Sequence, residues 1–179
     1  MPPKIANIVA VADLGNAIIL SDLSDKIPGE FSYNPAKFKA AILKISYPFK
    51  STFLIWSSGK IVCLGLKNLE ECEQTIKYLV EHIKYDICSS VFYSGYYVEN
   101  IVTSFNFGKE INLNAFRSLR PKSSFYEPEI FCGLNYKRGD RLTALIFYTG
   151  KIVITGGKNL EEINEMYYHI LPYLKLSSK

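Results

Sequence analysis

The chain has 179 residues, of which 48% are hydrophobic and 21% charged, and its formal net charge is +4. This composition excludes an intrinsically disordered chain, and the mild positive charge permits a polyanionic partner without requiring one. The start of the chain has no apolar signal core and no apolar run reaches the length of a membrane span, so we expect a soluble intracellular protein.

The first half of the chain predicts strands and helices in a mixed order. Apolar and β-branched residues predict a strand over 5–13, and a weaker pattern predicts a short helix over 15–27. A turn is expected at 33–35, followed by a strand over 40–47 and a hairpin of strands 52–56 and 60–65. Asn68 is expected to cap a helix that runs through Lys84, where apolar residues recur at helical spacing.

The second half repeats this order. A strand is expected over 100–107, a helix over 112–119, and strands over 133–137, 142–148 and 151–156. Asn159 is expected to cap a helix through Leu171, with Pro172 disturbing its end.

The two halves are copies of one unit. Residues 58–71 read SGKIVCLGLKNLEE and residues 149–162 read TGKIVITGGKNLEE, with ten of fourteen positions identical. ANIV at 6–9 matches ENIV at 99–102, and the aromatic residues at 38 and 131 also correspond. Two copies are too few for a solenoid, so we expect a pseudo-twofold pair of domains with the boundaries 1–88 and 89–179.

The cysteines give no sign of a metal site. Cys63, Cys72, Cys88 and Cys132 have neither CxxC spacing nor a zinc pattern with His82 or His169. We expect buried reduced thiols, no disulfide and no cofactor.

Each unit has apolar residues on both faces of its strands. Ile61 and Cys63 point one way while Val62 and Leu64 point the other. Two helices can cover only one face of a sheet. The second face is therefore either an open binding surface or a surface covered by a partner subunit or by the other repeat.

The residues of this second face suit the minor groove of A·T-rich DNA, whose floor offers hydrogen-bond acceptors. They are uncharged and medium-sized, with one equivalent asparagine in each copy: Asn7, Val9, Leu54, Trp56, Val62 and Leu64, then Asn100, Val102, Leu145, Phe147, Val153 and Thr155. Cations that could meet phosphates, or could simply be solvated, flank the face: Lys37, Lys44, Lys60, Lys137, Arg138 and Lys151, with Lys67 and Lys158 just beyond. Two aromatic pairs, Phe38 with Trp56 and Phe131 with Phe147, could be inserted between base pairs.

Several segments, in order and in duplicate, resemble the TATA-box-binding protein family over essentially the whole chain. They are NIV at 7–9 and 100–102, YNPAKF at 33–38, SGKIV at 58–62, YEPEIF at 126–131, LIF at 145–147 and GKIVITGGK at 150–158. The resemblance implies an α+β saddle of two tandem pseudo-symmetric repeats, with a curved antiparallel sheet below and helices above. It implies a general transcription initiation factor that binds and bends A/T-rich promoter DNA through the minor groove, in the nucleus if the organism is eukaryotic. Neither catalysis, nor a small-molecule substrate, nor a membrane partner is expected.

The resemblance also assigns roles to single residues. The family's intercalating residues fall on the two aromatic pairs, and its central asparagines on Asn7 and Asn100. Its contact for a transcription factor IIB-like protein falls on Glu127, Glu129 and Ile130. Other initiation factors could bind the helices.

Several residues depart from the family pattern and indicate a divergent, TATA-box-binding-protein-related member. Trp56 replaces the usual Phe, Leu64 the usual Thr, and Cys132 a Pro. The helix over 68–84 is acidic where eukaryotic members are basic, which weakens a transcription factor IIA contact there.

Two other functions compete with DNA bending. The fold could serve as a protein-interaction scaffold with weak or no TATA-specific binding. An enzyme could use Glu127 and Glu129 with His82 or His169, although the chain has no nucleophile elbow, phosphate-binding glycine loop or metal spacing.

Overall fold

The computed structural model describes residues 2–24 and 26–178, which form two compact units. The N-terminal unit comprises Asn7–Glu99, and the C-terminal unit comprises the residues up to Ala6 together with those from Asn100 onward. The same architecture occurs in each unit, as the sequence repeat predicts.

In the N-terminal unit, antiparallel strands lie in the order β2-β3-β4-β5-β1. The elements are β1 (Lys4–Asp13), the 3-10 helix η1 (Leu20–Leu23), β2 (Glu30–Ser32), β3 (Ala41–Ile45), β4 (Ser51–Ile55), β5 (Lys60–Leu66) and α1 (Leu69–Asp86). The strand β1 begins in the C-terminal unit and continues into this one.

In the C-terminal unit, the corresponding antiparallel order is β6-β10-β9-β8-β7. The elements are β6 (Tyr96–Asn106), α2 (Leu113–Leu119), β7 (Ser124–Phe125), β8 (Leu134–Arg138), β9 (Leu142–Ile146), β10 (Lys151–Gly157) and α3 (Leu160–Ser177). The predicted α+β class with two tandem repeats is therefore confirmed.

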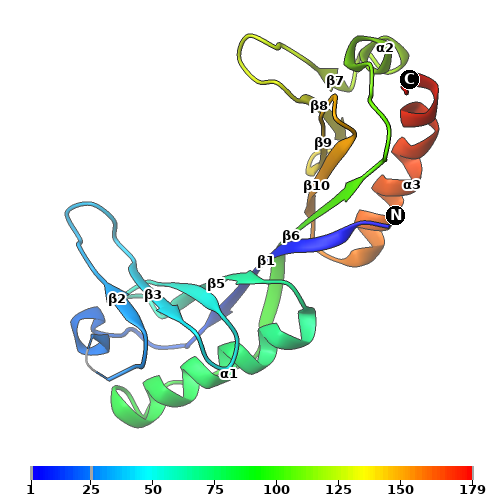
Figure 1. Ribbon diagram of the computed structural model, residues 1–179. Helices are drawn as coiled ribbons and strands as arrows, with labels where there is room; N and C mark the ends of the chain where they lie inside the picture. Colours follow the sequence, from blue (N-terminus) through cyan, green and yellow to red (C-terminus); the bar gives the residue numbers. More distant parts are fainter. Residues whose placement is uncertain (1, 25, 179) are drawn as a thin grey trace. The chain divides into compact units, whose positions relative to one another are not determined.

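Helices cover one face of the strands in each unit (Figure 1). In the N-terminal unit, Phe53 and Ile61 of the strands are fully buried together with Ile76 and Leu79 of α1. The C-terminal unit buries the equivalent strand positions against Met166, Ile170 and Leu174 of α3. Each such aliphatic or aromatic side chain contributes about 1.5–3 kcal/mol on burial, so this helix-covered face is the core of the unit.

The predicted helix caps are confirmed. The Asn68 side chain accepts a hydrogen bond from the backbone N–H of Glu70 at 3.1 Å, and Asn159 accepts one from Glu162 at 2.8 Å. The acidic residues of each first turn also favour the positive end of the helix dipole. Both long helices thus begin where their asparagine satisfies a free N–H group.

The helix predicted over 15–27 is wrong, because only Leu20–Leu23 forms a single 3-10 turn. Gly15 has a φ of +68°, and the backbone N–H of Ile18 donates to the carbonyl of Ser57 in the β4–β5 hairpin. The segment is therefore bonded to the hairpin and cannot make a continuous set of helical hydrogen bonds.

The predicted helix end near Leu171 is also wrong, because α3 continues past Pro172 to Ser177. Pro172 is exposed, so the carbonyl that loses its hydrogen-bond partner can be solvated. Leu174 and Ser177 beyond it are buried and hold the last turns against the unit. Packing thus outweighs the local cost of the proline.

The cysteines are free but differ in burial. Cys63 and Cys72 are buried, and burial raises the pKa of their thiols to about 12 and about 11. The prediction of buried thiols is wrong for Cys132, which is exposed in the β7–β8 loop, and for Cys88, which is only half-buried. Within the residues described, no helix is long and apolar enough to cross a membrane.

Candidate nucleic-acid interface

The strand residues of the second parity, apart from the buried Val11, are accessible in both units. Where Phe53 and Ile55 are fully buried, the alternating Leu54 and Trp56 are only half-buried, and the same holds for Leu145 and Phe147 of the C-terminal unit. In the part of the chain that the structure describes, no helix of a unit packs on this side of its strands. We call this surface the open face of each unit.

The open face contains residues that the sequence analysis did not select. They are Ile42 and Thr52 in the N-terminal unit, and Ser104, Asn135 and Thr143 in the C-terminal unit; Val11 has the same parity but is buried, at 5% exposure. Each lies directly opposite a selected residue in the strand register, as Ile42 lies opposite Leu54. Extending the period-two alternation along each strand would have found them.

Asn7 and Asn100 are held in equivalent ways. The side-chain oxygen of Asn7 accepts from the backbone N–H of Gly65 at 2.8 Å, and that of Asn100 accepts from Gly156 at 2.8 Å. Both glycines have positive φ, +98° and +92°, next to irregularities in the strand register. A Cβ at Gly156 would collide with the carbonyl oxygen of Arg141, so this approach requires glycine. The bond to each oxygen fixes the orientation of the amide, whose NH2 group is the donor; that of Asn100 also donates to the Thr155 hydroxyl at 3.2 Å, which leaves its second N–H for a ligand.

The two aromatic pairs have the same construction. Phe38 and Trp56 meet edge to face with 6.4 Å between ring centroids, and Phe131 and Phe147 do so at 5.8 Å. The first ring of each pair is 45% and 38% exposed, respectively, so neither is a core residue.

Two backbone turns fix each aromatic pair. The N–H of Phe38 donates to the carbonyl of Asn34, and that of Phe131 donates to Glu127, at 2.9 Å in both loops. The second ring of each pair stands at the start of the turn between two paired strands. There the N–H of Gly59 donates to the carbonyl of Trp56, and that of Gly150 donates to the carbonyl of Phe147. The positions of the rings therefore follow from the backbone rather than from side-chain packing alone.

Gly133 makes room for the second pair and was missed by the sequence analysis. A Cβ at this position would lie 2.7 Å from Cε1 of Phe131 and 3.0 Å from Cε1 of Phe147. Both distances are shorter than van der Waals contact, so the rings occupy the space that the missing side chain leaves.

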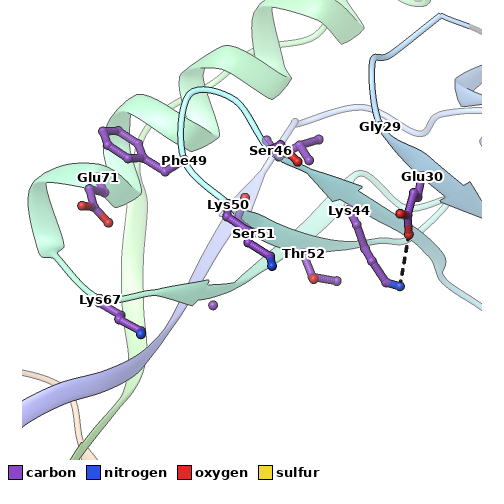
Figure 2. A pocket seen from close by; sticks show the side chains of 12 residues that line it. Gly29, Glu30, Lys44, Ser46, Phe49, Lys50, Ser51, Thr52, Lys67 and Glu71 are labelled. Atoms are coloured by element: carbon purple, nitrogen blue, oxygen red, sulfur yellow. Dashed lines mark hydrogen bonds and ion pairs between the residues drawn. The ribbon is translucent and has the colours of Figure 1, made fainter.

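Lysines gather at one edge of the N-terminal open face (Figure 2). Lys44, Lys50 and Lys67 line a hollow of about 970 Å³ together with Ser51 and Thr52. The Lys44 ammonium group lies 3.3 Å from the Glu30 carboxylate, a pair exposed enough to be screened by solvent. Glu71 also lines the hollow, so its three lysines stand against two glutamates and its net charge is only mildly positive.

The other predicted cations divide into two groups. Lys37, Lys60, Lys137 and Lys151 are exposed, and the last three share the strand parity of the open face. Arg138 does not flank this face, because its parity points it toward α3, where it pairs with Glu165 at 3.5 Å. Its predicted phosphate contact is wrong for that reason.

The residues predicted to bind a protein partner lie in the loop between β7 and β8. Glu127 and Glu129 are exposed, and Ile130 is 79% exposed. The equivalent loop between β2 and β3 carries Lys37 and Lys39 instead. The two loops, each projecting from its unit (Figure 1), thus have opposite charge.

The fold and these faces define a class: tandem-repeat α+β proteins with helices on one side of each sheet and an apolar, asparagine-bearing side left open. The family model described as "Transcription factor TFIID (or TATA-binding protein, TBP)" matches residues 2–85 and 87–176. The chain belongs to the TATA-box-binding protein family. This is a family of DNA-binding transcription factors and not of enzymes.

Curated relatives and a solved structure agree with this assignment. TATA-box-binding protein 2 of Entamoeba histolytica is 38% identical over 178 residues, covering 99% of this chain and 82% of the relative. The TATA-box-binding protein of Archaeoglobus fulgidus is 36% identical over 174 residues, covering 96% and 94%. The solved structure of the Methanococcus jannaschii protein matches with a TM-score of 0.80 and 32% identity, covering 98% of this chain and 99% of that one.

Replacing Gly133 with Ala should separate the rings of Phe131 and Phe147 while the unit stays folded. The exposed Phe131 ring can swing outward, so we expect the free energy of unfolding to change by less than about 1 kcal/mol. Ring-to-ring nuclear Overhauser effects between the two phenylalanines should weaken. The double variant Gly133→Ala with Phe131→Ala is the control. It lacks the Phe131 ring, so the added methyl group no longer clashes with that ring. A loss of more than about 2 kcal/mol in the single variant would show that the rings are packed as core residues.

Proposed function

We propose that this protein is a general transcription initiation factor that binds the minor groove of A/T-rich promoter DNA with its open faces and bends the duplex. The observation that carries the proposal is an open face in each unit that is uncharged at its centre, with lysines only at the strand ends and an anchored asparagine, Asn7 or Asn100. The proposal also assigns the chain to the nucleus if its organism is eukaryotic.

The chemistry of the minor groove matches these faces. In A·T pairs the groove floor presents adenine N3 and thymine O2, which are acceptors, and G·C pairs add the guanine N2 amino group, a donor. The asparagine amide nitrogens can donate to these acceptors, and the bonds that their oxygens accept from Gly65 and Gly156 hold the two side chains in place. Aliphatic residues such as Val62 and Val153 fit against a floor without that amino group.

The exposed lysines supply the part of the affinity that does not depend on sequence. Lys60 and Lys151 stand at the starts of equivalent strands, and Lys44 and Lys137 stand at equivalent register positions. Contacts of such lysines with phosphates release counterions, so binding should weaken steeply as salt rises.

The aromatic pairs support bending. Inserting an apolar ring between base pairs unstacks them at a cost of about a few kcal/mol per step, and the bent duplex then contacts more protein. Each unit offers one ring pair whose first member is exposed and whose position is fixed by backbone turns. Flexible pyrimidine–purine steps would be the easiest to deform, which favours sites containing TA steps.

The acidic β7–β8 loop supports a protein partner resembling transcription factor IIB. Glu127, Glu129 and Ile130 offer two negative charges beside an exposed apolar side chain, which suits a basic partner surface with an apolar contact. The basic loop of the N-terminal unit would repel that surface, so the partner would distinguish the two units.

Replacing both Phe131 and Phe147 with Ala should reduce the DNA bend and lower affinity for a TATA duplex by about tenfold or more. The fold should survive, with a loss of no more than about 2 kcal/mol, because these rings are partly exposed. Fluorescence transfer between the duplex ends measures the bend. Phe92→Ala is the control, since that ring is exposed outside both open faces.

An unchanged bend would exclude insertion by this pair, and global unfolding would place the rings in the core. If the unaltered protein binds neither TATA nor scrambled duplexes at low salt in a mobility-shift assay, the protein is a scaffold rather than a DNA-binding factor.

Replacing Glu127 with Arg should leave binding to DNA intact and abolish assembly with a transcription factor IIB-like protein, because the loop charge is reversed. Glu110→Arg is the matched control, an exposed glutamate of the same unit outside the loop. Supershift of the protein–DNA complex by the partner measures assembly. If Glu127→Arg and Glu110→Arg assemble equally well, the partner binds elsewhere.

A further inference from the structure

The open faces of the two units can be compared position by position through their strand registers. In the N-terminal unit, Val11, Val62, Leu54 and Ile42 lie directly opposite one another across β1, β5, β4 and β3. The equivalent row of the C-terminal unit is Ser104, Val153, Leu145 and Asn135 across β6, β10, β9 and β8. The central two positions are alike, whereas both ends change from aliphatic to polar; at the first end Val11 is buried and Ser104 is half-buried, and at the other end Ile42 and Asn135 are both half-buried.

A second row repeats this difference. Leu64 and Thr52 are opposite each other in the N-terminal unit, and Thr155 and Thr143 are opposite each other in the C-terminal unit. The threonine at the second position is kept, so Leu64 against Thr155 is the change in this pair. At the outer edge the difference is reversed: the N-terminal unit has the polar Ser32 on β2, and the C-terminal unit has the apolar Phe125 on β7.

The change at Leu64 alters the surroundings of the equivalent asparagines. The Asn100 amide nitrogen lies 3.2 Å from the Thr155 hydroxyl, which can both donate and accept. The Asn7 oxygen makes the same bond to a bulge glycine, but Leu64 occupies the position of that hydroxyl and can do neither. The N-terminal open face therefore has less capacity to accept hydrogen bonds.

We propose, on the basis of the proposed DNA binding, that the two open faces differ in base preference. The N-terminal face requires A·T pairs, because Leu64 and Ile42 would leave a guanine N2 amino group buried without an acceptor. The C-terminal face tolerates G·C pairs, because Thr155, Asn135 and Ser104 each carry an oxygen that can accept from that group. The protein consequently binds an asymmetric site in one orientation.

The exposed Cys132 allows the orientation to be measured. It adjoins Phe131 in the loop of the C-terminal unit, whereas Cys63 and Cys72 are buried. An iron chelate attached at Cys132, in a Cys88→Ser background, would cleave DNA near that unit. The probe is a duplex with A·T pairs in one half of the site and two G·C pairs in the other, used with its mirror arrangement as the matched control.

We expect cleavage at the half that contains G·C pairs, with a bias of about tenfold, corresponding to one unsatisfied buried donor. The exchange Leu64→Thr with Thr155→Leu should remove or reverse the bias. Because Thr155→Leu could weaken binding by itself, Leu64→Thr alone is the second variant, and it should raise affinity for G·C pairs in the other half.

Equal cleavage at both ends by a protein that binds the duplex would overturn this inference and leave the proposed function standing. A bias that persists unchanged in the exchanged variant would also overturn it. Failure to bind any duplex would overturn the proposed function and the inference together.

Discussion

The structure depends on one constraint: each unit has helices for one face of its sheet and apolar residues on both. The helix-covered face, with Phe53 and Ile61 fully buried, stabilises the unit. The opposite face is left accessible at Leu54 and Val62, at a cost in exposed apolar surface. A ligand surface that is shallow and largely uncharged would bury these apolar side chains on binding. The floor of a DNA minor groove is such a surface, which is why it suits this face.

Duplication explains why the functional positions occur in equivalent places, and divergence explains why they are not identical. The bulge glycines, Gly65 and Gly156, and the asparagines bonded to them are retained because the backbone geometry depends on them. The neighbouring positions Leu64 and Thr155 have diverged, and only Thr155 adds a hydrogen bond to its asparagine, Asn100. The loops have also diverged in charge, with Lys37 and Lys39 in one and Glu127 and Glu129 in the other.

Much of the fold followed from sequence because its signals are local and repeated. Asn68 and Asn159 predicted their helix starts, and the alternation of Ile61 with Val62 predicted two different faces. Local patterns failed where tertiary contacts decide: α3 continues past Pro172 because Leu174 is buried, and the segment around Ile18 bonds to the hairpin rather than to itself. For the site, parity located the asparagines together with Trp56 and Phe147, whereas the loop residues Phe38 and Phe131 were found from the correspondence of the two repeats. It could not show that Gly133 accommodates two rings or that Arg138 turns toward Glu165, since both depend on distances across the fold.

The central claim is that the open faces contact DNA through the minor groove. It is tested most directly by replacing every A·T pair of the preferred site with an inosine·cytosine pair. Such pairs have the A·T pattern in the minor groove and the G·C pattern in the major groove. Affinity for the substituted duplex should stay within about threefold of the original, because the hydrogen-bonding groups on the minor-groove floor are unchanged. A loss of affinity as large as that caused by G·C replacement would contradict the claim.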